Sequence, residues 1–231
     1  MHRRSSRRRG GRAVVVELVG PAGAGKTTLA KGVRRADRTV HAGLSLWGLP
    51  RGRLLASAIA LIPTMVKAAV RNQRLRWPEI THMMRLDALW QVLRREAARH
   101  RLILLDEGPV FALGWLDLCF ARHGARAPAA WRRRAVAAWA TVLDAVVFLD
   151  ASDATLADRI RTRDKRHRMR NGTDAAIGRF AAGFRKAFDR VITELGRMGH
   201  VVVEQLRTDG DSLDRSAARL LATLERRRNG H

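Results

Sequence analysis

Residues 20–28 read Gly20-Pro21-Ala22-Gly23-Ala24-Gly25-Lys26-Thr27-Thr28 and carry the strongest signal in this chain. They match the pattern G-x-x-x-x-G-K-[ST] and lie between a strand-like apolar run, 13–19, and a helical pattern that begins near Lys26. The glycines permit backbone conformations that other residues avoid, so successive N–H groups can point at phosphate oxygens. A turn that only joins a strand to a helix has no need of Lys-Thr after its glycines. The motif therefore predicts a phosphate-binding loop.

Each part of this loop has a predicted role. The backbone N–H groups and the positive end of the following helix are expected to bind the phosphates of ATP or a similar nucleotide. Lys26 is placed to reach the β- and γ-phosphates, and the Thr27 hydroxyl is suited to coordinate Mg²⁺. The predicted cofactor-binding residues are Gly20, Ala22, Gly23, Ala24, Gly25, Lys26, Thr27 and Thr28.

Outward from the loop, short apolar runs alternate with longer helical patterns. The runs at 13–19, 101–106, 145–150 and 200–206 are almost continuously apolar, which indicates strands covered on both faces, and a weaker run at 38–41 could add a fifth. This alternation predicts an α/β fold of the P-loop NTPase kind, with a mostly parallel five-stranded sheet and helices on both faces. Helices are predicted at 26–35, 54–71, 78–99, 111–122, 128–141, 154–168, 175–198 and 212–228.

The strand predicted at 101–106 ends in two adjacent carboxylates, Asp106 and Glu107, and Gly108-Pro109 then breaks it. Ligands of a parallel sheet bind beyond the carboxyl ends of its strands, which places Asp106 beside the loop. We expect Asp106 to hold the metal together with Thr27, and Glu107 to accept a proton from an attacking hydroxyl. The alternative is that the two carboxylates only cap the helix that follows Pro109.

An arginine-rich segment follows the strand that ends at Asp150. If 154–168 is one helix, Arg159, Arg163 and Arg166 share a face that could close over the transferring phosphates. The alternative is a solvated basic face, because this chain scatters arginine widely. The position after the fourth strand favours a lid at about 153–172, with Arg159 and Arg163 as catalytic residues.

Together these motifs resemble the nucleoside and nucleotide kinase group of P-loop proteins, the thymidylate-kinase-like members especially. The resemblance spans about 13–228 and rests on the loop at 20–28, Asp106, the strand ending in Asp150, and the R-x-x-x-R at Arg159 and Arg163. It implies a flexible arginine lid and a phosphotransferase that moves the γ-phosphate of ATP, with Mg²⁺, to a small-molecule acceptor held by helices at about 41–100.

The chain departs from that group at the third strand. Thymidylate kinases carry Asp-Arg there and deoxynucleoside kinases Glu-Arg-Ser, whereas this chain has Asp106-Glu107-Gly108, so the arginine that would orient a nucleotide acceptor is missing. Arg85 is the best substitute for binding an acceptor phosphate, followed by Arg53 and Trp47. The apolar stretch 54–70 would also suit a hydrophobic acceptor that is not a nucleotide.

The composition of the chain bears on its expected partners and cellular compartment. The 231 residues carry a formal net charge of +24, and 45 of them are basic, mostly arginine spread along the whole chain. That spread favours a solvated surface over a nucleic-acid footprint. The single cysteine, Cys119, excludes an internal disulfide and fits the cytoplasm. The basic segment 1–12 is expected to be a disordered tail, and the interrupted stretch 54–70 is too short to span a membrane.

Two other classes of function remain as alternatives. A nucleic-acid-dependent ATPase or polynucleotide kinase would account for the charge, although no nucleic-acid-binding module is recognisable. A regulatory nucleotide switch would leave the arginines of 153–172 incidental. The patterns do not choose between ATP and GTP, name the acceptor or set the oligomeric state, for which a homodimer is one option.

Overall fold

The computed structural model of this chain describes residues 13–163, 167–209, 218 and 222. Five parallel strands form one sheet in the order β2-β3-β1-β4-β5. The predicted α/β architecture with a five-stranded parallel sheet is confirmed. The strands are β1 Val14–Val19, β2 His41–Leu44, β3 Leu102–Asp106, β4 Ala145–Asp150 and β5 Val202–Arg207.

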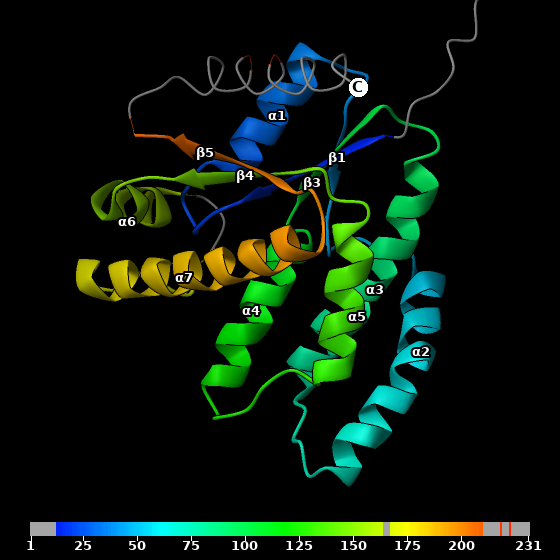
Figure 1. The fold of residues 1–231 in the computed structure, drawn as a ribbon. Helices are drawn as coiled ribbons and strands as arrows, with labels where there is room; N and C mark the ends of the chain where they lie inside the picture. Colours follow the sequence, from blue (N-terminus) through cyan, green and yellow to red (C-terminus); the bar gives the residue numbers. More distant parts are fainter. Residues whose placement is uncertain (1–12, 164–166, 210–217, 219–221, 223–231) are drawn as a thin grey trace, which may run out of the picture.

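Helices cover both faces of this sheet, as Figure 1 shows, with α1 on one side and most of the others on the opposite side. Alternate residues of β1 divide between the two faces: Val15 and Val19 belong to the hydrophobic core that contains residues of α3, α4, α5 and α7, whereas Val16 and Leu18 belong to the core that contains residues of α1. The helices are α1 Lys26–Ala36, α2 Arg51–Val70, α3 Trp77–Glu96, α4 Pro109–Ala121, α5 Ala129–Ala140, α6 Asp153–Thr162 and α7 Asp174–Met198.

Two predicted elements differ from the structure. The strand predicted at 38–41 runs instead from His41 to Leu44, because Asp37 Oδ1 accepts hydrogen bonds from the backbone and hydroxyl of Thr39 and closes a turn there. The helix predicted at 154–168 ends at Thr162, since Arg163 is already extended with φ −66° and ψ 144°. The predicted tail at 1–12 and helix at 212–228 lie outside the described residues, apart from 218 and 222.

The stretch predicted to be too short for a membrane span belongs to a longer helix. Helix α2 has 20 residues and an apolar window of mean hydropathy 1.6, so by length and composition it is the one helix in the described part of the chain that could cross a bilayer. The core helix of a soluble protein can pass the same test. What α2 presents to its surroundings is therefore more informative than its hydropathy.

Candidate functional site

The loop after β1 needs its glycines for two different physical reasons. A Cβ at Gly20 would lie 2.1 Å from the backbone oxygen of Leu149, so only glycine lets the loop pass this close to β4. Gly23 and Gly25 have φ values of 88° and 89°, in the left-handed region that side chains disfavour. Gly25 also begins helix α1. The loop therefore wraps over the helix N-terminus, as a phosphate cradle requires.

The ammonium group of Lys26 lies inside this loop. Its Nζ donates to the carbonyls of Gly20 at 2.7 Å and Pro21 at 3.0 Å. Burial lowers the pKa of Lys26, while the nearby carboxylates of Asp106 and Glu107 act in the opposite direction. The two carbonyl contacts are of a kind that phosphate oxygens can replace.

Thr27 and Asp106 meet at the carboxyl ends of two neighbouring strands. The Thr27 hydroxyl donates to Asp106 Oδ2 at 3.3 Å, and β1 pairs with β3 so that Leu18 lies opposite Asp106. A hydroxyl and a carboxylate at one place are ligands that suit a hard divalent cation such as Mg²⁺. The donor set fits the ion that the loop motif implies.

Glu107 faces the same space by an unusual backbone turn. Its φ is 65°, so the chain reverses at Glu107 itself, one residue before the predicted break at Gly108-Pro109. This turn lets two consecutive carboxylates serve one site, which an extended strand would not allow. The indole Nε1 of Trp47 donates a hydrogen bond to Glu107 Oε2 and sets the orientation of that carboxylate.

The first turn of α4 is capped by Glu17, a buried residue of β1 that the sequence patterns did not single out. Its carboxylate accepts the backbone N–H groups of Gly108, Val110 and Phe111 at 2.8–3.0 Å. In the described structure these bonds go to Glu17 rather than to Asp106 or Glu107. One acidic residue in the middle of an apolar strand was the available signal, because such a charge persists only with buried partners.

Glu17 should make stability depend on pH. Burial raises its pKa from 4.5 to about 7, against the opposing effect of its three N–H donors. The folded state then retains a proton that the unfolded state releases, so the contribution of Glu17 to the free energy of unfolding should fall by up to roughly 3 kcal/mol as pH rises from about 4.5 to about 7.

Denaturant titrations across that pH range measure this dependence. Glu17→Gln cannot titrate and should remove this contribution from the slope, whereas Asp158→Asn, at an exposed carboxylate, should keep the wild-type slope. Parallel slopes for wild type and Glu17→Gln would show that Glu17 is ionised throughout.

One cavity of about 1010 Å³ is lined by the loop, Asp106, Glu107 and Trp47. Its polar end is formed by the loop, Thr28, Asp106 and Glu107. All the predicted nucleotide-binding residues line the cavity except Ala24, whose side chain is buried. Its other end is aromatic, with side chains from α4 and α7 that the sequence patterns also missed: Phe111, Trp115, Phe180 and Phe184. The i, i+4 spacing within each pair was the usable signal.

The segment 41–100, expected to bind the acceptor, contributes little to this cavity. Ser45 and Trp47 line it, whereas no residue of α2 or α3 does. Arg53 donates to Gln91 Oε1 at 3.2 Å and so joins α2 to α3 away from the cavity. The apolar residues of 54–70 are likewise not part of the lining, so this cavity does not support the hydrophobic acceptor site suggested for them.

Arg85 lies behind Trp47, with its guanidinium carbon 4.2 Å from the centroid of the indole ring. Its Nη1 is buried and has no hydrogen-bond partner in the part of the chain that the structure describes. A buried, unpaired guanidinium nitrogen is costly, so it indicates a partner such as a ligand or an ordered water molecule.

The arginine segment borders the cavity without forming the predicted shared helical face. Arg159 is tied down: its guanidinium donates to the Gly23 carbonyl at 3.3 Å and to the hydroxyl and carbonyl of Thr208 at 2.9 and 2.7 Å. Arg163 lies beyond the end of α6 and lines the cavity, as do His167 and Arg168. Arg166 lies outside the described residues. Arg159, within α6, also lines the cavity but is fixed by these bonds, whereas Arg163 lies beyond the break after Thr162.

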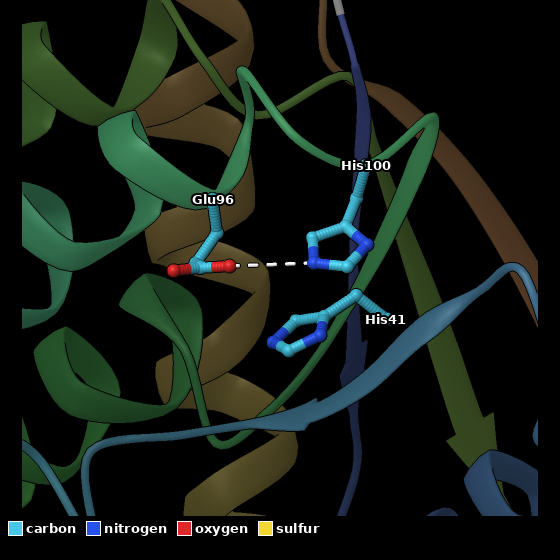
Figure 2. A group of neighbouring side chains, drawn as sticks. All are labelled: His41, Glu96 and His100. Carbon is cyan, nitrogen blue, oxygen red and sulfur yellow. Dashed lines mark ion pairs between the residues drawn. The ribbon is translucent and has the colours of Figure 1, made fainter.

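A separate cluster of His41, Glu96 and His100 lies at the start of β2, at the opposite end of the strands from the loop (Figure 2). Glu96 pairs with His100 at 3.3 Å and with Arg99 at 3.2 Å. The two imidazole rings stack with centroids 4.3 Å apart and planes 24° from parallel, so their in-plane lone pairs do not converge. The arrangement suits a histidine pair held by a carboxylate better than a metal ion.

Comparison with known proteins identifies the fold. The structure is similar to deoxyadenosine kinase from M. mycoides, with 12% identity, a TM-score of 0.54, and coverage of 92% of this chain and 99% of that one. It is also similar to thymidylate kinase from Candida albicans, with 13% identity, a TM-score of 0.56, and coverage of 95% of this chain and 94% of that one. No protein-family model matches the chain, and no curated protein matches it significantly. The chain thus has the fold of P-loop nucleoside and nucleotide kinases, which confirms the structural resemblance predicted from its motifs.

Proposed function

We propose that this chain, with its nucleoside and nucleotide kinase fold, is an ATP- and Mg²⁺-dependent kinase of a small-molecule acceptor. The observation that carries the proposal is the meeting of Lys26, the Thr27–Asp106 pair and Glu107 at the polar end of one cavity. A nucleotide and a second molecule could share this cavity, because about 1010 Å³ exceeds what one drug-sized ligand needs. The two relatives in fold are kinases of nucleosides and nucleotides, which supports the same reaction class.

At the nucleotide end, the chain supplies charge and orientation. The N–H groups of the loop and of the first turn of α1 bind the phosphate oxygens, and Lys26 exchanges its carbonyl partners for the β- and γ-phosphates. Thr27 and Asp106 would hold the metal. Mg²⁺, when bound, neutralises charge on the phosphates and thereby favours their transfer.

Where the two reactants would meet, Glu107 is the proposed general base. Its carboxylate accepts the hydroxyl proton of the acceptor while the acceptor oxygen bonds to the γ-phosphorus and the bond to the ADP oxygen breaks. Before the acceptor binds, the indole hydrogen bond of Trp47 holds the carboxylate in place. An acceptor that presents a phosphate oxygen instead has no proton to lose at neutral pH and would not need this step.

The two lid arginines take different roles in this proposal. Arg163, at the cavity wall, is the proposed stabiliser of negative charge on the transferring phosphoryl group. Arg159 is a positioning residue, because its bonds to Gly23 and Thr208 fix the loop against the end of β5. Loss of Arg159 should therefore weaken nucleotide binding, and loss of Arg163 should lower kcat.

The acceptor is proposed to be a flat or apolar molecule that carries an anionic or strongly polar group. Phe111, Trp115, Phe180 and Phe184 offer it ring surface, and Arg85 offers a charged donor. Arg85 stands behind Trp47, so contact with the acceptor requires the indole to shift. In this proposal Arg85 takes the place of the acceptor-orienting arginine that is missing after β3.

Arg85→Met should raise the KM for the acceptor by about 10- to 100-fold with little change in kcat, since it removes a charged hydrogen bond made in ground and transition states alike. Steady-state kinetics with varied acceptor measures both constants. Arg94→Met is the matched control. Arg94 belongs to the same helix as Arg85 and also stacks on a tryptophan, with its guanidinium carbon 4.9 Å from the centroid of the Trp90 ring, but its side chain is exposed. Equal kinetic effects of the two substitutions would remove Arg85 from the acceptor site.

The activity itself is tested in two steps. Thermal shifts with a non-hydrolysable ATP analogue, with and without Mg²⁺, test the nucleotide site, and a screen of nucleosides, nucleotides and metabolites in its presence identifies the acceptor. ADP release with the best acceptor then measures transfer. ATP hydrolysis that depends on single-stranded nucleic acid and falls steeply with salt would favour the nucleic-acid-dependent alternative. Binding without turnover of any acceptor would favour a nucleotide switch.

A further inference from the structure

Helix α2 exposes a continuous apolar stripe. Leu55, Ile59, Ile62, Val66 and Val70 are each between 52% and 80% exposed. Their spacing of three or four residues puts them on one side of the helix over its whole length. Figure 1 shows α2 as the outermost helix of its layer, with α3 and α5 on its inner side. This face is unpartnered among the described residues.

The opposite face of α2 is already committed to the domain. Ser57, Leu61, Thr64 and Ala68 are buried. The Ser57 hydroxyl accepts from Gln91 of α3 at 3.1 Å, and the Thr64 hydroxyl accepts from Arg134 of α5 at 3.3 Å. These contacts set the rotation of the helix, so the apolar stripe cannot turn inward without breaking them. The stripe is therefore available to a partner outside the described residues.

The charge around the stripe has a single sign. Residues 45–78 contain six basic residues and no aspartate or glutamate. Three of the six, Arg71, Arg74 and Arg76, form an exposed cluster just beyond the end of α2. Trp77 follows them and is 74% exposed. An apolar stripe with basic neighbours and an exposed tryptophan at one end has the composition of a helix that lies in a membrane interface.

We propose that this face of α2 docks onto the surface of a bilayer that contains anionic phospholipids, with the helix parallel to the membrane plane. The apolar stripe enters the boundary between head groups and acyl chains, while Arg71, Arg74 and Arg76 contact the phosphates. A span across the bilayer is incompatible with the polar contacts of Ser57 and Thr64 inside the domain.

Charge distinguishes a lipid surface from a second copy of the chain. Two copies joined through α2 would bring two sets of like charges together with no acidic residue of 45–78 between them. Helix α5, next to α2, also carries no acidic residue but exposes Arg133 and Arg134. A negatively charged bilayer is attracted by the same residues that repel a copy.

Flotation of the full chain with vesicles tests the proposal. The protein should float with vesicles of phosphatidylcholine and phosphatidylglycerol and remain behind with phosphatidylcholine alone. Ile59→Asp combined with Ile62→Asp should lower the partition coefficient by about tenfold or more, because apolar contact is lost and negative charge is added. Arg71→Gln combined with Arg74→Gln should reduce binding to the anionic vesicles only.

The controls separate the stripe from general basicity. Met198→Asp removes an exposed apolar residue at the end of α7, 51% exposed, and should leave flotation unchanged. Every variant keeps residues 1–12, so attraction through that basic segment is common to all. Thermal unfolding and binding of the ATP analogue should match wild type in each variant, which makes failure of docking distinguishable from failure of the proposed kinase function.

Three outcomes would overturn the proposal. The wild-type chain could fail to float with anionic vesicles. The Ile59 and Ile62 variant could float as well as wild type, in which case charge alone binds the lipid. Light scattering could reveal a dimer that the same variant separates, and a second copy would then be the occupant of this face.

Discussion

Lys26→Ala should lower kcat by at least about 10³-fold, so that phosphoryl transfer is abolished in an ordinary assay. The ammonium group is the cation held within the loop, and alanine leaves the phosphate charge there without that partner. The fold should survive, because Lys26 packs against loop carbonyls and not within either hydrophobic core. ADP release measured together with thermal unfolding tests both halves of this expectation.

Lys31→Ala is the matched control for Lys26. Lys31 lies on the same helix, α1, and its side chain is exposed to solvent, so its loss should change neither turnover nor stability. If turnover by Lys26→Ala equals that of wild type, the kinase function is wrong. If Lys26→Ala unfolds at much lower temperature, its loss of activity says nothing about phosphate binding, and Lys26→Met with its longer side chain becomes the informative variant.

Glu107→Gln should cut kcat by about 10²- to 10⁴-fold while the affinity for ATP stays nearly the same, if the acceptor reacts through a hydroxyl group. Glutamine keeps an oxygen that can accept the hydrogen bond from Trp47, and it fits the φ of 65° as well as glutamate does. What it loses is the capacity to take up a proton. Single-turnover kinetics with saturating ATP isolates this step.

Asp106→Asn provides the contrast to Glu107→Gln. It should weaken Mg²⁺ dependence and ATP binding, because Asp106 shares the proposed metal position with Thr27 at 3.3 Å. Full kcat in Glu107→Gln together with a lower unfolding temperature would make Glu107 a structural residue. Asp106 would then have to be reconsidered as the base.

The residues of the proposed nucleotide half of the site lie together in the structure, and this could be predicted because the motif is local. Nine consecutive residues form the loop, and the strand that ends at Asp106 is recognisable by its apolar run. The parallel sheet then brings Asp106 to Thr27 although they are 79 residues apart. A short motif and one rule of sheet topology were enough for this half.

The acceptor half depends on contacts between distant segments, which no local pattern contains. Phe111 and Phe184 stack, with ring centroids 6.4 Å apart, across two helices that the sequence presents as ordinary core helices. Glu17 was hidden for the same reason, because its partners lie more than 90 residues further along the chain. The helix after β4 was predicted too long, because the helical spacing of the arginines continues past Thr162 whereas the helical backbone ends there.

The hydrogen bonds of Glu17 fix the distance between the proposed binding sites of the two reactants. Glu17 lies three residues before Gly20, where the phosphate donor is proposed to bind, and its carboxylate accepts hydrogen bonds from the first turn of α4, where Phe111 begins the proposed acceptor site. In this proposal, the gap between donor and acceptor is set by one strand, one buried carboxylate and one helical turn. A fixed distance of this kind selects acceptors by the position of their reactive oxygen. A molecule whose oxygen lies about an ångström too far from the phosphorus reacts more slowly, however tightly it binds.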